Sequence, residues 1–192
     1  MEKKKKKMRI IGGKFKGKPI MFLKSPDTRP LKDSVKENIF NIILHSKLIN
    51  VELKNSKILD LYSGVGSFGL EAISRGAEKV TFVEKNKEAI NSLKNNINSL
   101  SIKKNIKLFE SDINEVIKNE RVEKFDFLFL DPPFKDNNFI QIIKLIKIRK
   151  LFNKKSIVIM HREKKTIDDF ETILSVFLTK TYGKSKILFA SF

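Results

Sequence analysis

From Lys57 onward, short apolar runs alternate with longer amphipathic stretches, and this alternation constrains the possible folds more than any other feature of the chain. The clearest apolar run, Phe125–Leu130, predicts a buried strand. Between Asn86 and Leu100 the apolar residues recur at helical spacing, which predicts an amphipathic helix. Strands that alternate with helices favour a mostly parallel sheet with helices on both faces. The sequence therefore predicts an α/β fold.

The same patterns predict the other elements of this fold. Strands are expected at 58–62, 80–83, 106–109, 157–160 and 186–189. Helices are expected at 33–46, 64–74, 113–119, 139–148 and 166–178. Near the start, residues 8–18 have the pattern of two short strands around a glycine turn. A chain of 192 residues then suffices for one domain with a small appendage.

The charge balance bears on the partner. The chain has 40 Lys and Arg against 22 Asp and Glu, a formal net charge of +18, which favours a polyanion, most simply nucleic acid. Compositional drift offers another explanation, because Lys, Asn and Ile are abundant throughout. There is no cysteine, so disulfides, thiolate metal sites and cysteine nucleophiles are excluded. We expect a cytoplasmic protein without a metal, and without membrane association, because the apolar runs are too short to span a bilayer.

Ligands of parallel sheets bind beyond the carboxyl ends of the strands, so the residues that follow each strand are the candidates for a site. The first predicted strand leads into a loop with glycines at 64, 66 and 69. Glycines let the backbone turn tightly and let a ligand approach it closely. This spacing also matches the dinucleotide fingerprint G-x-G-x-x-G, so a NAD-type site stays open at this point. Asp60, just before the loop, joins Gly64 and Gly66 as a candidate for cofactor binding.

Acidic residues follow the next two predicted strands. Glu84 suits a pair of ribose hydroxyls, although a solvated acid at a strand end is the alternative. Asp112 could accept the amino group of an adenine while Ile113 packs on its ring. The alternative for Asp112 is a helix N-cap. His161 follows the fifth strand and could line the same cleft, whereas His45 lies at a helix end and is expected to be structural.

The motif Asp131-Pro132-Pro133-Phe134, which follows Phe125–Leu130, decides between these ligands. Two prolines fix the backbone and remove two amide donors. The Asp131 carboxylate and the Pro132 carbonyl can then accept both hydrogens of a planar NH₂ group, while Phe134 stacks on the base. That geometry steers the nitrogen lone pair toward a methyl donor. We therefore predict an S-adenosyl-L-methionine-dependent amino methyltransferase, with a strand-terminating turn as the alternative for the motif in isolation.

Several stretches of the chain also resemble the RsmD family, bacterial methyltransferases of guanine N2 in small-subunit (16S) ribosomal RNA. The resemblance covers residues 8–134 and is carried by Arg9–Gly17, Thr28-Arg29-Pro30, Leu59-Asp60-Leu61, Ser74–Ala77, Phe82-Val83-Glu84 and Asp131–Phe134, with Tyr182-Gly183 also fitting. It implies a Class I methyltransferase fold, that is, a Rossmann-like, seven-stranded, mostly parallel sheet with a small N-terminal β element. It also implies S-adenosyl-L-methionine as cofactor and pre-assembled small-subunit RNA as substrate.

The resemblance further implies roles and boundaries. Asp60, Gly64 and Gly66 would surround the methionine part of the cofactor, and Asp131 to Phe134 would hold the guanine. Phosphates of the RNA would be bound by the basic residues Arg9, Lys14, Lys16, Lys18, Arg29 and Lys32. We expect a disordered basic tail at 1–7, an N-terminal β element and first helix that contact RNA at 8–50, and a catalytic domain at 51–192 in a monomer. The chain departs from the family pattern at Tyr62-Ser63, usually Phe-Ala, at Ser34, usually basic, and at Lys36, usually Arg.

Two other hypotheses remain open. An amino methyltransferase with the same chemistry could act on DNA adenine or on a protein glutamine. A DNA enzyme usually needs a further recognition region, and glutamine enzymes typically carry Asn where Asp131 stands. A noncatalytic ribosome-assembly protein that binds RNA is the third hypothesis, and the intact motif at 131–134 argues against it.

Overall fold

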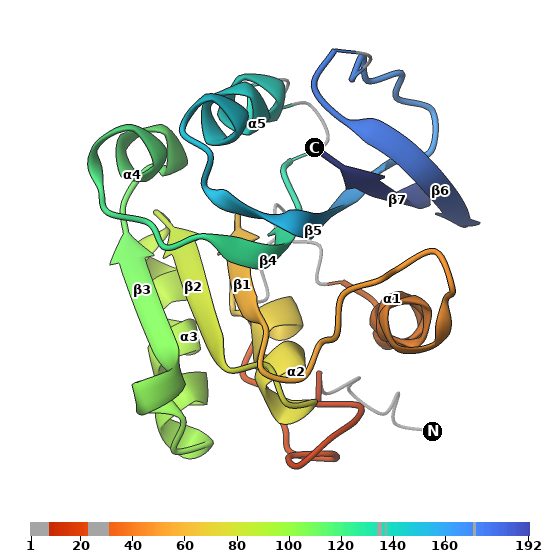
Figure 1. The fold of residues 1–192 in the computed structure, drawn as a ribbon. Helices are drawn as coiled ribbons and strands as arrows, with labels where there is room; N and C mark the ends of the chain where they lie inside the picture. Colours follow the sequence, from red (N-terminus) through yellow and green to blue (C-terminus); the bar gives the residue numbers. More distant parts are fainter. Residues whose placement is uncertain (1–7, 23–30, 134–135, 137, 171) are drawn as a thin grey trace.

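A computed structural model of the protein describes residues 8–22, 31–133, 136, 138–170 and 172–192. The described residues form one seven-stranded sheet in the order β3-β2-β1-β4-β5-β7-β6 (Figure 1). Its strands are β1 (Lys57–Leu61), β2 (Lys79–Glu84), β3 (Ile106–Glu110), β4 (Phe125–Leu130), β5 (Phe152–Glu163), β6 (Ser175–Tyr182) and β7 (Ser185–Ser191). The expected basic tail at 1–7 lies outside the described residues.

The first five strands are parallel, whereas β7 is antiparallel to both β5 and β6. The chain proceeds from β1 outward to β3 on one side and then returns, so that β4 and β5 lie on the other side of β1. This reversal between β1 and β4 opens a crevice at the carboxyl ends of the strands, where ligands of such sheets bind. The predicted α/β fold with a mostly parallel sheet is confirmed.

Helices cover both faces of the sheet (Figure 1). Residues of α1 (Asp33–His45), α2 (Ser67–Ser74) and α3 (Lys87–Ser99) belong to one hydrophobic cluster. Residues of α4 (Ile113–Asn119) and α5 (Phe139–Ile148) belong to a second cluster, on the opposite face. A short 3₁₀ helix, η1 (Lys103–Asn105), precedes β3. Among the described residues no helix is long and apolar enough to cross a membrane.

The strand β4 shows how the sheet separates these two clusters. Phe127 and Phe129 pack in the first cluster, whereas Leu128 and Leu130 pack in the second. Successive side chains of a strand point to opposite faces, so the apolar residues Phe127–Leu130, which follow Asp126 in the strand, are buried on both sides of the sheet. This is why the run at 125–130 gave the clearest prediction of a strand.

The N-terminal element differs from the prediction at 8–18. Instead of two strands, it contains a single antiparallel bridge between Arg9 and Pro19. Gly13 and Gly17 have φ of 74° and 86°, so most of the segment is used by turns. Backbone hydrogen bonds join the two arms from Ile10 N to Lys18 O, from Gly17 N to Ile10 O and from Ile20 N to Met8 O.

The helix predicted at 166–178 is wrong. Phe170, Ile173 and Leu174 do reach the second core cluster, but they do so from an irregular segment, and the strand β6 begins at Ser175. Short apolar runs fit a helix or a strand equally well, and pairing decides between them. Here β6 hydrogen-bonds to β7, which would otherwise present an unpaired edge.

Candidate active site

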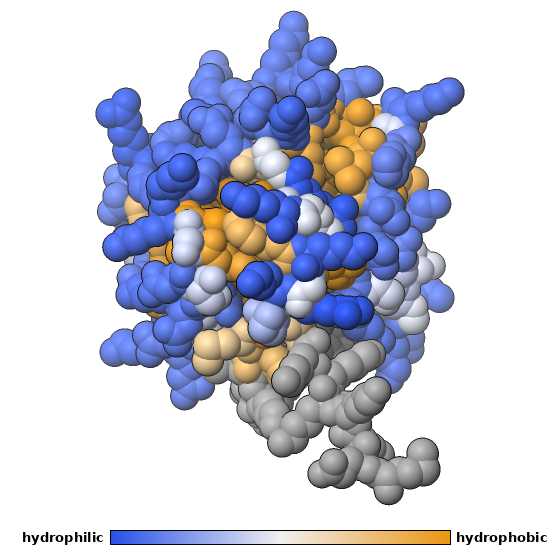
Figure 2. All heavy atoms as spheres, turned by 90° about the horizontal axis from the view of Figure 1, so that it is seen from below, coloured by the Kyte–Doolittle hydropathy of each residue, from blue (hydrophilic) through white to orange (hydrophobic). Residues whose placement is uncertain are grey.

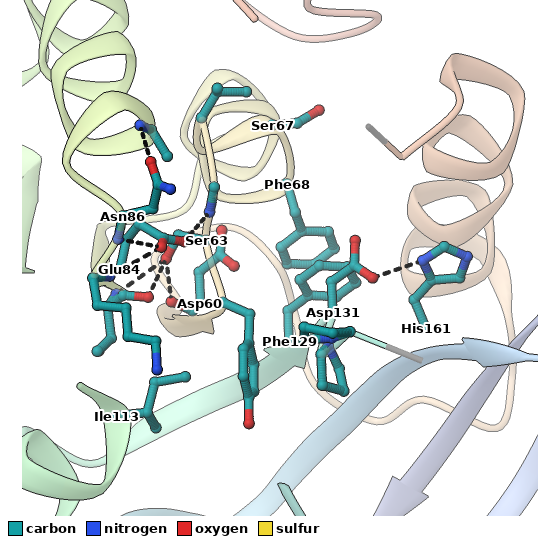
Figure 3. A pocket seen from close by; sticks show the side chains of 18 of the residues that line it. Asp60, Ser63, Ser67, Phe68, Glu84, Asn86, Ile113, Phe129, Asp131 and His161 are labelled. Carbon is teal, nitrogen blue, oxygen red and sulfur yellow. Dashed lines mark hydrogen bonds and ion pairs between the residues drawn. The ribbon is translucent and has the colours of Figure 1, made fainter. Parts of the chain in front are cut away.

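A pocket of about 550 Å³ opens at the carboxyl ends of the strands. It brings together the predicted site residues Asp60, Gly64, Glu84, Asp112, Ile113, Asp131, Pro132 and Pro133. In Figure 3, Glu84 and Ile113 lie on one side of the pocket and Asp131 lies on the other. Phe134 lies outside the described residues. The pocket coincides with the crevice at the reversal between β1 and β4.

The glycine loop that follows β1 ends at Gly66, which precedes the first turn of α2. Gly66 has φ of 81°, and a Cβ on it would lie 2.4 Å from Leu93 Cδ1. Gly66 therefore serves the turn and the approach of α3, and it is not among the residues that line the pocket. Gly64 has φ of 54° and does line the pocket. The predicted helix at 64–74 accordingly begins three residues later, at Ser67.

Asp60 is 1% exposed and still contributes to the pocket wall. Its Oδ2 accepts a hydrogen bond from the backbone N–H of Gly69, 3.0 Å away. Burial raises the pKa of Asp60 well above its usual range, and the carboxylates of Asp131 and Glu84 reinforce this shift, which the Gly69 N–H opposes. A buried carboxylate among other acids is stabilised by a positive charge brought into the pocket.

Glu84 ends β2 and shapes the glycine loop. Its Oε2 accepts the backbone N–H of Gly64 at 2.7 Å, and its Oε1 accepts that of Asn86 at 2.9 Å. Ser63 stands where the family usually has Ala, and it links β1 to β2. Its Oγ donates a hydrogen bond to Asp60 O in β1 at 2.6 Å and accepts one from Val83 N in β2 at 3.0 Å. The carboxylate of Glu84 is thus held by backbone N–H groups in the pocket wall and is not a freely solvated strand end.

Asp112 lies between α4 and the pocket. It is the N-cap of α4, with Oδ1 accepting from Asn114 N at 2.9 Å, and it also lines the pocket. The Lys85 ammonium, 3.0 Å from its Oδ2, lowers the pKa of Asp112, and the Asn114 N–H adds to this effect. Ile113, next to it, is buried and also lines the pocket.

At the other end of the pocket, Asp131 follows β4 and His161 lies in β5. His161 Nδ1 is 2.8 Å from Asp131 Oδ1, and His161 is among the lining residues (Figure 3). The register pairs Leu130 with Met160, so the residues that follow each of them lie side by side. The sequence left the position of His161 open, and the structure brings it into the cleft.

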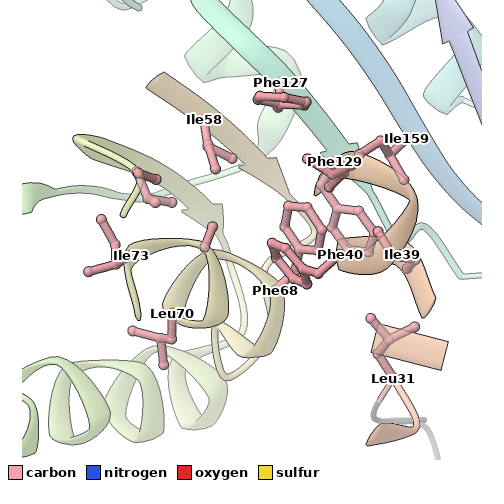
Figure 4. Packing of buried hydrophobic residues seen from close by; sticks show 14 of the residues in the cluster. Leu31, Ile39, Phe40, Ile58, Phe68, Leu70, Ile73, Phe127, Phe129 and Ile159 are labelled. Carbon is pink, nitrogen blue, oxygen red and sulfur yellow. The ribbon is translucent and has the colours of Figure 1, made fainter. Parts of the chain in front are cut away.

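A column of aromatic rings supports this end of the pocket. Phe68 of α2 stacks on Phe129 of β4, with ring centroids 4.0 Å apart and planes 8° apart. Phe40 of α1 stacks on the other side of Phe68 at 5.0 Å (Figure 4). Phe68 and Phe129 also line the pocket. The helical pattern of 33–46 predicted a buried face for α1 but gave no sign that it would support the pocket.

Tyr62, where the family usually has Phe, joins the glycine loop to the segment after the proline motif. Its hydroxyl donates to Asp136 Oδ2 at 3.0 Å, and both residues line the pocket. Burial raises the pKa of Tyr62, and the Asp136 carboxylate adds to the shift. The phenol therefore stays protonated and acts as a hydrogen-bond donor at neutral pH.

A buried ion pair attaches the N-terminal element to this site. Glu71 of α2 accepts the backbone N–H groups of Ile11 and Gly12, each at 2.7 Å, and the Arg75 Nε at 2.7 Å. Lys36 of α1 lies 3.6 Å from Glu71 and donates to Arg9 O at 2.9 Å. Burial lowers the pKa of Lys36, and Glu71 opposes that shift. Lys36 therefore has a structural role here, whereas Ser34 is exposed.

The predicted RNA-binding residues lie on the surface. Arg9, Lys14, Lys16, Lys18 and Lys32 are all exposed, and Arg29 lies outside the described residues. Arg9 is 3.9 Å from Asp33, an exposed pair that costs little to break. Figure 2 shows that hydrophilic side chains dominate one face of the molecule, with apolar side chains gathered between them. Phosphates could reach the cations of the N-terminal element without displacing buried groups.

Comparison with known proteins gives the family. A family model described as Conserved hypothetical protein 95 matches residues 8–191. The Ribosomal RNA small subunit methyltransferase D of Haemophilus influenzae is 37% identical over 144 residues, which is 74% of this chain and 72% of that protein. The protein of the same name from Buchnera aphidicola subsp. Acyrthosiphon pisum is 34% identical over 163 residues, 85% and 82% of the two chains. The chain belongs to the RsmD family.

The fold agrees with this membership. The solved structure of yhhF, a candidate methyltransferase from Escherichia coli, superposes with a TM-score of 0.81 and 22% identity, covering 96% of this chain and 97% of that one. At that identity the likeness concerns the fold alone. The predicted Rossmann-like methyltransferase fold of an RsmD-family protein is therefore confirmed, and the NAD-type alternative is not supported.

Proposed function

We propose that this chain transfers a methyl group from S-adenosyl-L-methionine to the exocyclic N2 amino group of a guanine in small-subunit (16S) ribosomal RNA. Membership of the RsmD family supports the class of acceptor, and the guanine N2 atom is inferred from the resemblance to that family. The observation that carries the chemistry is an acidic pocket, ending in Asp131-Pro132-Pro133, in a chain with a net charge of +18.

The charges of the pocket fit a cationic cofactor. Among the described lining residues, one lysine, Lys85, stands against five carboxyl groups, those of Asp60, Glu84, Asp112, Asp131 and Asp136. S-adenosyl-L-methionine carries a sulfonium and an ammonium group, and it supplies a methyl group made electrophilic by the positive sulfur. Acidic side chains with restricted access to water attract such cations more strongly than exposed ones do.

Each end of the pocket suits one part of that ligand. Asp60 and Gly64 would surround the methionine part, beside the first turn of α2, whereas Gly66 shapes the turn without lining the pocket. Glu84 would accept the ribose hydroxyls, since two carboxylate oxygens match two neighbouring donors. Asp112 would accept the adenine amino group, and the buried Ile113 offers an apolar surface to the ring.

The target base would meet the opposite end. The carboxylate of Asp131 and the carbonyl of Pro132 can each accept one N–H of a planar amino group, which leaves the nitrogen lone pair directed at the methyl carbon. Holding both reactants in contact supplies proximity that can contribute several kcal/mol, about 7–11 in the best cases. The nitrogen becomes acidic as its bond to carbon forms, so water can take the released proton and no strong base is required.

The N-terminal element would bind the RNA. We propose that Arg9, Lys14, Lys16, Lys18 and Lys32, with Arg29, contact phosphates, which fix the position of the base without reading sequence. The substrate would be RNA already folded within an assembling small subunit, and the protein would act as a monomer. Glu71 and Lys36 would transmit the position of this element to α2, which carries Phe68 at the pocket.

The test is methyl transfer from labelled cofactor to small subunits that lack the mark, followed by mass-spectrometric mapping of the modified nucleoside. Asp131→Ala should keep RNA binding and lose transfer by roughly 100-fold or more, the cost of a misplaced reacting group. Glu110→Ala, at the exposed acid that ends β3 outside the pocket lining, is the control. Competition between RNA, DNA and a protein glutamine substrate separates the alternatives, and absence of transfer to every ribosomal substrate by folded protein would contradict the proposal.

A further inference from the structure

His161 is placed to control the orientation of the Asp131 carboxylate. It lies on the central strand β5, between β4 and β7, and is 8% exposed. The residue paired with it on the neighbouring strand β7 is Ile187, which is fully buried. A ring on a central strand with an apolar neighbour behind it has few rotamers available. The 2.8 Å contact from Nδ1 to Asp131 Oδ1 therefore joins a buried side chain of β5 to the residue that directly follows β4.

The chemistry of the two groups fixes the direction of this hydrogen bond. An ionised carboxylate only accepts hydrogen bonds, so Nδ1 must carry the hydrogen and donate it. Oδ1 of Asp131 is then engaged by His161, and Oδ2 remains for a donor in the pocket. Without the imidazole, the carboxyl group could rotate about its terminal bond, because that torsion is broad and twofold.

We propose that His161 is a positioning residue for the methyl-transfer reaction: through Nδ1–H it holds Asp131 Oδ1 so that Oδ2 faces the amino group of the target base. This inference rests on the proposed function for the role of Asp131. It adds a residue to the site that the proline motif itself does not contain. The imidazole touches neither the base nor the cofactor in this role and acts through Asp131.

Two amide substitutions distinguish this role from simple packing. In His161→Asn the side-chain nitrogen occupies the place of Nδ1, whereas in His161→Gln it lies near the place of Nε2. In His161→Leu and His161→Gln, kcat should fall about 10–100-fold. The KM for the RNA and the affinity for the cofactor should change less than about threefold. Asn at 161 should restore kcat to within about fivefold of the wild type. Unchanged kcat in His161→Leu, or equal rates for Asn and Gln, would contradict the inference.

A second measurement needs neither cofactor nor substrate. The chain has two histidines, His45 and His161, so ¹⁵N spectra of the imidazoles can be assigned with a single His45→Gln variant. In the free protein, Nδ1 of His161 should carry a hydrogen, and Asp131→Ala should shift the ring toward the Nε2–H tautomer. A ring that is Nε2–H in the wild type, or that does not respond to Asp131→Ala, would overturn the proposed donor.

The two measurements separate the inference from the proposed function. If the folded wild type transfers methyl groups to no ribosomal substrate, the proposed function fails, and with it the role of the pair in that reaction. Active wild type together with an unaffected His161→Leu variant would remove the role of His161 alone. Both are supported if the wild type is active, His161 carries its hydrogen on Nδ1, kcat falls in His161→Gln and kcat is restored in His161→Asn.

Discussion

Glu84 and Glu110 lie in register at the carboxyl ends of the neighbouring strands β2 and β3, but their surroundings differ. Glu84 accepts backbone hydrogen bonds from Gly64 and Asn86 and lines the pocket. Glu110 is exposed and its Oε1 is 2.6 Å from the Lys94 ammonium. Two acids of equal charge, one strand apart, therefore offer a matched comparison of a site residue with a surface residue.

Glu84→Gln should weaken S-adenosyl-L-methionine binding about 10–100-fold. A hydrogen bond to a charged group contributes roughly 1.5–3 kcal/mol, and every 1.4 kcal/mol is a factor of ten in affinity. Isothermal titration calorimetry on the purified protein measures the change. Glu110→Gln is the control and should bind the cofactor like the wild type; equal losses in both variants would exclude a specific role for Glu84.

Asp60→Asn should stabilise the free protein and weaken cofactor binding at least about tenfold. Asn removes a buried charge yet keeps an oxygen to accept the Gly69 N–H. If the gain is about 1 kcal/mol, the melting temperature should rise by about 2–4 °C at neutral pH. Calorimetric scans and titrations measure the two effects, and Glu110→Gln, at an exposed acid outside the pocket lining, serves as the control. A variant that binds the cofactor normally would contradict the assigned role.

The same carboxyl group predicts a pH dependence. Because the pKa of Asp60 is raised in the folded state, the folded protein holds this proton more tightly than the unfolded chain does. Its contribution to stability is therefore greatest at low pH and declines as pH rises from the ordinary carboxyl range through the raised pKa. The difference in melting temperature between Asp60→Asn and the wild type should widen with pH over that interval, and a constant difference would argue against it.

Glu71→Ala should destabilise the protein by about 3–5 kcal/mol. The substitution leaves the buried Lys36 ammonium without its opposite charge, and removing one member of a buried pair costs about this much. Urea unfolding measures the loss, and hydrogen exchange should show faster exchange at the Ile11 and Gly12 amides. Should the variant not fold, Glu71→Gln offers a milder test of the same amides. Glu123→Ala, which breaks the surface pairs of Glu123 with Lys57 and Lys79, should cost less than about 1 kcal/mol.

Replacing Lys14, Lys16 and Lys18 together by Ala should weaken RNA binding and reduce its salt dependence. If each lysine contacts one phosphate, the slope of log K against log salt should fall in magnitude by about 2. Fluorescence titrations of a fragment of small-subunit RNA at several salt concentrations measure this slope, and cofactor binding should not change. The control replaces the exposed Lys103, Lys104 and Lys154, at the amino ends of strands, and an equal effect there would indicate attraction by net charge alone.

The sequence was sufficient to predict which acidic residues line the pocket because of a general property of parallel sheets. Asp60, Glu84, Asp112 and Asp131 each lie at or near the end of an apolar run, and parallel strands place their carboxyl ends on one edge. The alternation of apolar runs and amphipathic stretches therefore specified both the sheet and its functional edge. For β4 the run was apolar on both faces, so the prediction needed no tertiary information.

Other features depended on contacts between distant segments. The helix predicted at 166–178 overlaps the first residues of β6, which begins at Ser175, and only the pairing of that strand with β7 decided between helix and strand there. Two strands were predicted at 8–18, but turns at its glycines occupy most of the segment, so it forms a single β-bridge. The ion pair of Lys36 with Glu71 joins α1 to α2. The sequence around each residue indicates a helix and does not indicate which residue of the other helix it contacts.

By itself, the sequence determined that Asp60, Glu84, Asp112 and Asp131 would lie at one edge of the sheet, because the carboxyl ends of parallel strands meet there. It did not determine how those residues would be oriented. The partner of Asp131 is His161, thirty residues away, and this pairing depends on the register between β4 and β5. Only the tertiary structure decided it, because a register is fixed by side-chain packing across the whole sheet and not by the residues of either strand alone.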